Sequence, residues 1–217
     1  MEAMRNDAIF MADKVYEMIG LVEKGFMEHK AEFLAGAMVC EKELNEMEKA
    51  LTLRVLEESK TALQKSDKKE LIVWQQVIET LERMGDEAAN LVERIEIKNA
   101  EHLLFSDMGV AQFNETYGIM KKSVDMMRLF LKGKSEELKA RIIDNGLSVK
   151  ALVKRYRQEH TERLLKGICT PIAANMYFDM LDFTGNLARH SSSIVTLFSV
   201  SENRDSALFS RSNSAGK

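Results

Sequence analysis

The chain has 217 residues, of which 45% are hydrophobic and 30% are charged, and its formal net charge is -3. This much apolar surface can form one large core or two small ones, but the charge balance gives no broad positive field for non-specific binding of nucleic acid. The longest uncharged apolar stretch, residues 33–40, is far shorter than the ~20 residues that a membrane-spanning helix needs. We therefore expect a cytoplasmic chain with no nucleic-acid partner and no membrane span.

The composition favours helices throughout. There are one Pro and 11 Gly in the whole chain, and apolar residues recur at spacings of three and four, with no alternating run that would indicate a strand. A first helix is predicted over residues 3–28 and a second over residues 32–64. The short connection between them predicts antiparallel packing.

A third helix is predicted after Asp67, which can form a capping box with Glu70. One face of this helix carries an apolar stripe and should therefore pack against a core. The stripe consists of Ile78, Leu81, Gly85, Ala88, Val92 and Ile95.

The pattern begins again after Ser106. A fourth helix is expected through Phe130 with a break at Gly133, and Ser135 is a suitable N-cap for a fifth, which the Asn145-Gly146 pair could kink. Gly167 predicts the end of the fifth helix. Thr170 followed by Pro171 then predicts the first turn of a sixth.

The sixth helix repeats the stripe of the third at a distance of one hundred residues. Gly185 and Ala188 correspond in this way to Gly85 and Ala88, and a glycine inside both stripes suggests a close approach between helices. We predict an all-α fold of two tandem three-helix repeats, over residues 1–104 and 105–200. The Ser-, Asn- and Arg-rich segment 201–217 is predicted to be a disordered tail. The full stripe of the sixth helix is Phe178, Leu181, Gly185, Ala188, Ser192 and Val195.

Oxygen-bearing side chains recur every fourth residue beside these stripes. Carboxylates one turn apart repel each other, and a bound cation is one way to stabilise them. Such ligands suit Mg, Ca, Mn or iron better than a structural zinc, although acidic residues beside an apolar stripe also form ordinary solvated boundaries. Candidate metal ligands are Glu41 and Asn45 on the second helix, Glu82 and Asp86 on the third, and Asp182 and His190 on the sixth.

No catalytic constellation is evident. A ferritin-like di-iron site needs Glu three residues before His, and no His in this chain has that neighbour. The sequence also lacks a Gly-rich phosphate loop, an HExxH motif and a nucleophile elbow. Cys40 and Cys169 have no metal-binding spacing and are expected to be reduced.

Leu81-Glu82-Arg83-Met84-Gly85-Asp86, followed by Ala88-Ala89-Asn90, resembles the signature of the PhoU family. Upstream, residues 41–45 resemble the companion motif of that family, in which Asp or Asn follows an acidic residue after four positions. In the second half, residues 157–164 and 167–171 are most similar to the PhoU-type region at the C-terminus of sodium/phosphate cotransporters.

The resemblance covers residues 1–200 and implies a six-helix, two-repeat fold and a role in controlling phosphate uptake. It also implies iron or another divalent metal, bound by Glu41, Glu82 and Asp86 with a weaker contribution from Asn45. The second half departs from the pattern, because Asn186 replaces an expected Asp, while Gly146 and Lys150 fall where the companion oxygens should be.

The implied partner is a membrane phosphate transporter or a phosphate-signalling protein, which would hold this non-enzymatic chain at the inner face of the membrane. The sequence is also compatible with a homodimer, and with a chain that is the soluble part of a longer transporter. The alternative function is a metal-dependent helical-bundle enzyme acting on phosphate compounds or oxygen.

Overall fold

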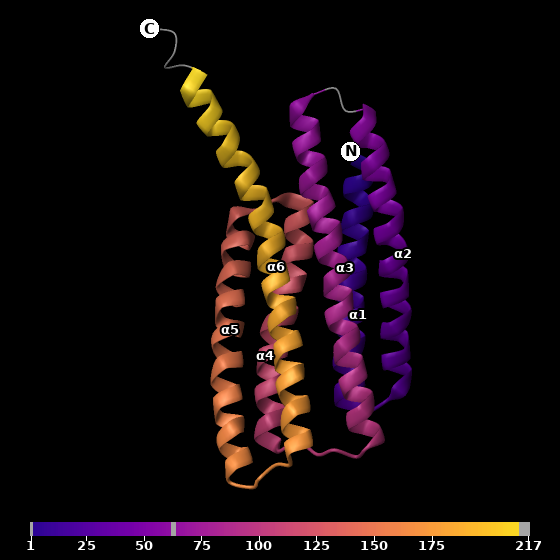
Figure 1. Ribbon diagram of the computed structural model, residues 1–217, viewed down its shortest axis with the longest axis vertical. Helices are drawn as coiled ribbons and strands as arrows, with labels where there is room; N and C mark the ends of the chain where they lie inside the picture. Colours follow the sequence, from indigo (N-terminus) through magenta and orange to yellow (C-terminus); the bar gives the residue numbers. More distant parts are fainter. Residues whose placement is uncertain (1, 62–63, 213–217) are drawn as a thin grey trace.

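The computed structural model describes residues 2–61 and 64–212, which form six helices and no strand. Helices α1 to α3 form one antiparallel bundle, and α4 to α6 form a second bundle beside it (Figure 1). The predicted all-α class is confirmed. The helices are α1 (Glu2–Glu28), α2 (Ala31–Thr61), α3 (Lys65–Ala100), α4 (Asp107–Gly133), α5 (Glu136–Leu165) and α6 (Pro171–Ser212).

The two bundles pack through α3 against α6 and α1 against α4. Aromatic rings cross this junction, since Phe198 of α6 lies 5.5 Å from Trp74 of α3, centroid to centroid. The hydroxyl of Tyr117 on α4 also donates a hydrogen bond to the Ile19 carbonyl of α1 at 2.8 Å. Both tyrosine and tryptophan are buried, so the apolar stripes of the two halves form one continuous core.

Most of the predicted helix ends in the second half are confirmed. Ser106 accepts a hydrogen bond from the Gly109 amide and Ser135 accepts one from the Leu138 amide, as N-caps do. Thr170 caps α6 in the same way. Gly167 ends the preceding turn with a φ of 69°, a conformation that glycine adopts without a steric penalty.

The capping box predicted at Asp67 is wrong. Helix α3 already begins at Lys65, and its N-cap is Gln64, whose side chain makes no capping hydrogen bond. Asp67 therefore lies inside the first turn, where its negative charge favours the positive end of the helix dipole. Glu70 accepts a hydrogen bond from Trp74 Nε1 at 3.3 Å instead of reaching back to a cap.

The predicted disordered tail needs a correction at its beginning. The backbone of α6 continues as a helix to Ser212, past the predicted boundary at Ser201, and this part of α6 extends beyond the bundle (Figure 1). A helix that is already formed can add residues without the cost of a new nucleus, which explains helical backbone in a polar segment. Residues 213–217 of the predicted tail lie outside the described residues.

The two stripe glycines have different surroundings. A methyl group added at Gly85 would come within 2.9 Å of Leu44 Cδ1 of α2, whereas one at Gly185 would meet Val153 at 3.5 Å, an ordinary contact. The close approach predicted for both glycines is therefore confirmed only in the first half. In the described part of the chain, no helix is long and apolar enough to span a bilayer.

We expect substitutions at the paired glycines to have opposite effects on the free energy of unfolding. Gly185→Ala should raise it by up to about 1 kcal/mol, because Ala favours helix over Gly and the added methyl has room. Gly85→Val should lower it by about 1–3 kcal/mol, because the buried Leu44 must move. Urea denaturation measures both, and equal effects at the two positions would contradict the packing described.

Candidate functional site

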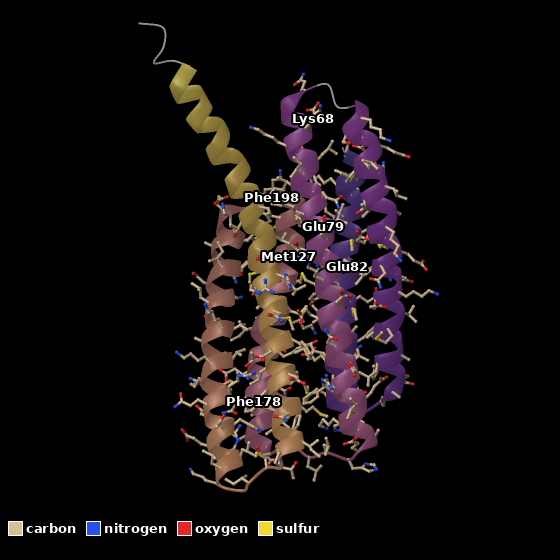
Figure 2. All side chains as sticks on the ribbon, in the orientation of Figure 1. Lys68, Glu79, Glu82, Met127, Phe178 and Phe198 are labelled. Carbon is tan, nitrogen blue, oxygen red and sulfur yellow. The ribbon has the colours of Figure 1, made fainter. Side chains whose placement is uncertain are left out.

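Four of the predicted ligands lie on two neighbouring helices of the first half. Glu41 and Asn45 come from α2, and Glu82 and Asp86 come from α3, which packs against it; we call these four residues the acidic group. Glu82 lies near the middle of α3 (Figure 2). Asn45 Nδ2 donates a hydrogen bond to Glu41 Oε1 at 2.6 Å, which links the two α2 members.

Two carboxylates of the acidic group, Glu82 and Asp86, have a raised pKa. The pKa of Glu82 lies above its usual value because of desolvation first and then because of the charges of Asp86, Glu48 and Glu41. The pKa of Asp86 is raised by desolvation and by Glu41. Both α3 carboxylates therefore sense Glu41 across the α2–α3 contact, and a proton or a cation would relieve the repulsion.

The chemistry of the acidic group fits a hard divalent cation. Carboxylate and amide oxygens are the ligands that Mg²⁺, Ca²⁺ and Mn²⁺ prefer. In residues 2–61 and 64–212, however, no group of three or more His, Cys, Asp or Glu side chains is arranged to hold a metal ion. The metal assignment of Glu41, Asn45, Glu82 and Asp86 stays a prediction.

Asp182 and His190, the two ligands predicted on α6, have different neighbours. Asp182 is half exposed, and its Oδ2 lies 2.5 Å from Arg157 Nη1 of α5. His190 is buried at the α3–α6 contact, and its Nε2 lies 3.3 Å from Arg189 Nη2. Burial and the charges of Arg189 and Arg83 lower the His190 pKa to about 4. The positive charges of Arg189 and Arg83 would repel a metal ion at His190, so this residue is poorly placed to bind one.

A polar contact that the sequence analysis missed crosses the α3–α6 junction. Asn186 Nδ2 donates to Glu87 Oε1 at 3.0 Å, and Glu87 Oε2 is buried without a hydrogen-bond partner among the described residues. Desolvation raises the Glu87 pKa, and the Asn186 hydrogen bond and Arg189 oppose that shift. The one available signal was its position next to Ala88 of the apolar stripe.

A pocket of about 590 Å³ lies between α5 and α6, on the second half. Its lining includes the four residues at the positions that match the acidic group in the first half. They are Gly146, Lys150, Asp182 and Asn186. The pocket thus brings together the four second-half residues that the predicted repeat pairs with the acidic group, and the chemistry of their side chains differs from that of the acidic group.

A buried polar network occupies the end of the second bundle. His160 stacks on Tyr177 with ring centroids 4.3 Å apart, and its Nδ1 lies 2.9 Å from Arg163 Nη2. Because arginine can only donate, Nδ1 is the acceptor. Gln112 accepts further hydrogen bonds from Arg163 and Tyr177. Burial and Arg163 lower the His160 pKa to about 4, so this network holds a neutral ring.

Large apolar side chains are exposed at the same end of the molecule. They lie in the α3–α4 and α5–α6 connections and at the adjoining helix ends, which Figure 1 shows together at the lower end of the bundle. Leu104 and Leu165 are the most exposed, at 86% and 83%. We call this set the apolar end: Leu104, Met108, Leu165, Ile168 and Ile172.

One protein-family model matches the first half of the chain, and the fold is similar to several solved structures. Residues 9–95 match the model of the PhoU domain. PhoU from Pseudomonas aeruginosa is similar in structure with a TM-score of 0.85 and 16% identity, covering 90% of this chain and 93% of the other. The phosphate transport system regulatory protein PhoU from Streptococcus pneumoniae has a TM-score of 0.80 and 13% identity, covering 93% and 94%.

A PhoU-like protein from Shewanella oneidensis is similar with a TM-score of 0.59 and 11% identity, covering 93% of this chain and 99% of the other. At these identities the solved structures show the fold alone, and it is the expected six-helix fold over nearly the whole chain. No curated protein matches the sequence.

The buried His190 should make the stability of the protein depend on pH. Its pKa is about 4 in the fold against an ordinary 6.5, so the unfolded chain binds the proton more readily and stability is lost as the pH falls from about 6.5 towards about 4. Between about pH 7 and about pH 5 the loss from this residue should be about 2 kcal/mol.

Urea denaturation at about pH 7 and about pH 5 measures the difference in unfolding free energy between the two conditions. His190→Gln should make that difference smaller. Leu187→Ala, which removes a buried side chain one turn earlier on α6, should lower stability similarly at both pH values. An unchanged pH difference in His190→Gln would contradict the assignment.

Proposed function

We propose that this chain, which carries a PhoU domain in residues 9–95 and has the PhoU fold along its length, regulates phosphate uptake by binding a membrane phosphate transporter or a phosphate-signalling partner. The observation that carries the proposal is the PhoU domain match. The similarity to a phosphate transport system regulatory protein, over 94% of that protein's length, supports it. It favours regulation over the metal-dependent enzyme considered from the sequence.

The apolar end is the surface that we assign to the partner. Soluble monomers seldom expose several large apolar side chains together, and such sets mark protein contacts. Here five of them lie around two neighbouring connections. The buried network contacts this region at two points, since Arg163 donates to Met108 Sδ at 3.5 Å and His160 Nε2 lies 3.5 Å from Sγ of Cys169, next to Ile168. A rigid base of this kind lowers the entropy cost of binding.

The transporter class to test first is a sodium/phosphate cotransporter, because residues 157–164 and 167–171 resemble the C-terminal region of those proteins. The second of these segments contains Ile168 of the apolar end. In this proposal the chain works in the cytoplasm, at the inner face of the membrane. Whether it acts there as one copy or as a homodimer is a further outcome of the same experiment.

We also propose that the acidic group binds a divalent cation such as iron or manganese. The support is the raised pKa of Glu82 and of Asp86, which desolvation causes first and the charge of Glu41 increases in both cases, together with an oxygen-only donor set. When bound, the ion would neutralise these charges and join α2 to α3. Asp182 and His190 are left out of this proposal, because one is paired with Arg157 and the other is buried beside Arg189.

The partner is tested by cross-linking in cells grown at low and at high phosphate, followed by identification of the captured proteins. The wild-type chain should recover a phosphate transporter or a phosphate-signalling protein. Leu165→Asp with Ile168→Asp should reduce that recovery strongly, because charges then replace exposed apolar side chains in the contact.

Leu53→Asp is the matched control, because Leu53 is 63% exposed on α2, outside the apolar end. It should recover the partner as the wild type does. Absence of any phosphate transporter or phosphate-signalling protein in both conditions would count against the function. Equal recovery with the double variant would count against the contact surface alone.

The metal proposal is tested by loading the purified protein with Mn²⁺ or Fe²⁺ and measuring bound metal by elemental analysis. Glu82→Gln and Asp86→Asn keep the shape of each side chain but remove a charge, and each should lose most of the bound metal. Metal uptake should also decrease as the pH is lowered, because protons compete with the metal for carboxylates whose pKa is raised. Asp182→Asn should bind metal as the wild type does. Unchanged uptake in both first-half variants would rule out the acidic group.

A further inference from the structure

The pocket between α5 and α6 combines apolar walls with positive charge. Ile143, Leu147 and Val153 provide the apolar lining, and Lys150 and Arg189 provide two cations. A shallower hollow of about 390 Å³ continues along α6 and shares Ile143 and Arg189 with the pocket. A cavity of this size, with few polar groups among apolar ones, is typical of a site for a small organic molecule.

The charges in the pocket do not cancel. Asp182 is its one carboxylate, and that carboxylate is already paired with Arg157 of α5. Lys150 is exposed and forms no ion pair or hydrogen bond with any residue that the structure describes. Arg189 contacts the neutral His190 and lies near Glu87. The uncompensated charge on the pocket is therefore positive, and it is centred on Lys150.

The equivalent positions in the first half carry the opposite charge. There the α2 residues are Glu41 and Asn45, whereas α5 presents Gly146 and Lys150. On α6, Asn186 takes the place of Asp86 and donates its amide to Glu87. The replacement of a carboxylate by glycine also removes a side chain from the pocket wall. At these positions the second half therefore has one carboxylate, Asp182, where the first half has three, and it adds the positive charge of Lys150.

We infer that the α5–α6 pocket binds a small organic anion, with its charged group at Lys150 and Arg189 and its apolar body on Ile143, Leu147 and Val153. A phosphate monoester or a carboxylate has the required chemistry. The apolar lining excludes inorganic phosphate as the best ligand, because a fully hydrated ion gains nothing from it. This site is independent of the apolar end and of the acidic group.

Close packing at Gly146 fixes the shape of the pocket. A methyl group there would lie 2.4 Å from Ser192 Oγ of α6, so α5 and α6 approach each other at this point. The Ser192 hydroxyl donates to the Ile142 and Ala188 carbonyls, at 3.3 and 3.2 Å, and is held in place. The pocket is consequently supported by two rigid helices and needs no rearrangement before a ligand binds.

Phenyl phosphate is a suitable probe, since it joins a phosphate to an apolar ring. It is titrated into the full chain by isothermal calorimetry, beside inorganic phosphate and benzyl alcohol, which each carry one half of its chemistry. We expect phenyl phosphate to bind at least about tenfold more tightly than either. Equal binding of inorganic phosphate, equal binding of benzyl alcohol, or no binding of phenyl phosphate would each overturn the proposal.

Lys150→Glu should weaken phenyl phosphate binding by about tenfold or more, because it replaces attraction by repulsion. Lys154→Glu, one turn further along α5, makes the same charge change at an exposed residue that does not line the pocket, and it should bind as the wild type does. Circular dichroism confirms that both variants fold. Equal weakening in the two variants would assign the effect to net charge and overturn the site.

Vesicles that contain phosphatidylglycerol test whether a lipid headgroup supplies the same chemistry. Under the proposal, phenyl phosphate binds without vesicles, and Lys150→Glu leaves any vesicle binding unchanged. If Lys150→Glu lost vesicle binding and the wild type did not bind phenyl phosphate, the proposal would be overturned and the ligand of the pocket would be a lipid headgroup.

Discussion

The packing of α3 against α6 is the contact on which the rest of the structure depends. Each three-helix half has an apolar stripe that it cannot bury alone, and the two stripes cover each other along this junction. Trp74 and Phe198 meet across it, and Arg94 pairs with Asp179 at 3.2 Å near its other end. Because α3 also carries Glu82 and Asp86 of the acidic group, and α6 forms one wall of the pocket, the core contact helps to position both candidate sites.

Much of the fold could be predicted because helix signals are local. The caps at Ser106, Ser135 and Thr170 depend on one side chain and one nearby amide, so sequence alone identifies them. Asp67 misled because a favourable cap sequence does not prevent helix from starting earlier. The end of α6 was predicted too early for a related reason, since a polar composition does not show at which residue a long helix ends.

The sites were harder to predict, because they depend on which side chains meet across helices. The sequence places Glu82 and Asp182 at equivalent positions, but only the fold shows that the first has acidic neighbours and the second pairs with Arg157. Spacing alone likewise does not show that the Glu87 carboxylate accepts a hydrogen bond from Asn186 across the junction. The resemblance of residues 81–90 to the PhoU signature agrees with the PhoU domain match over residues 9–95, a likeness that helical periodicity alone does not indicate.

The two halves illustrate how a repeated fold can support different chemistry. Each half contains three helices, and apolar stripe positions recur one hundred residues apart on α3 and α6. Stability requires only that the stripe stay apolar, which leaves the residues beside it free to change. In the first half, desolvation and repulsion raise the pKa of Glu82 and Asp86 and favour a cation. In the second half, where glycine and lysine replace Glu41 and Asn45, the same place becomes a pocket with positive charge, and the sign of the preferred ligand reverses.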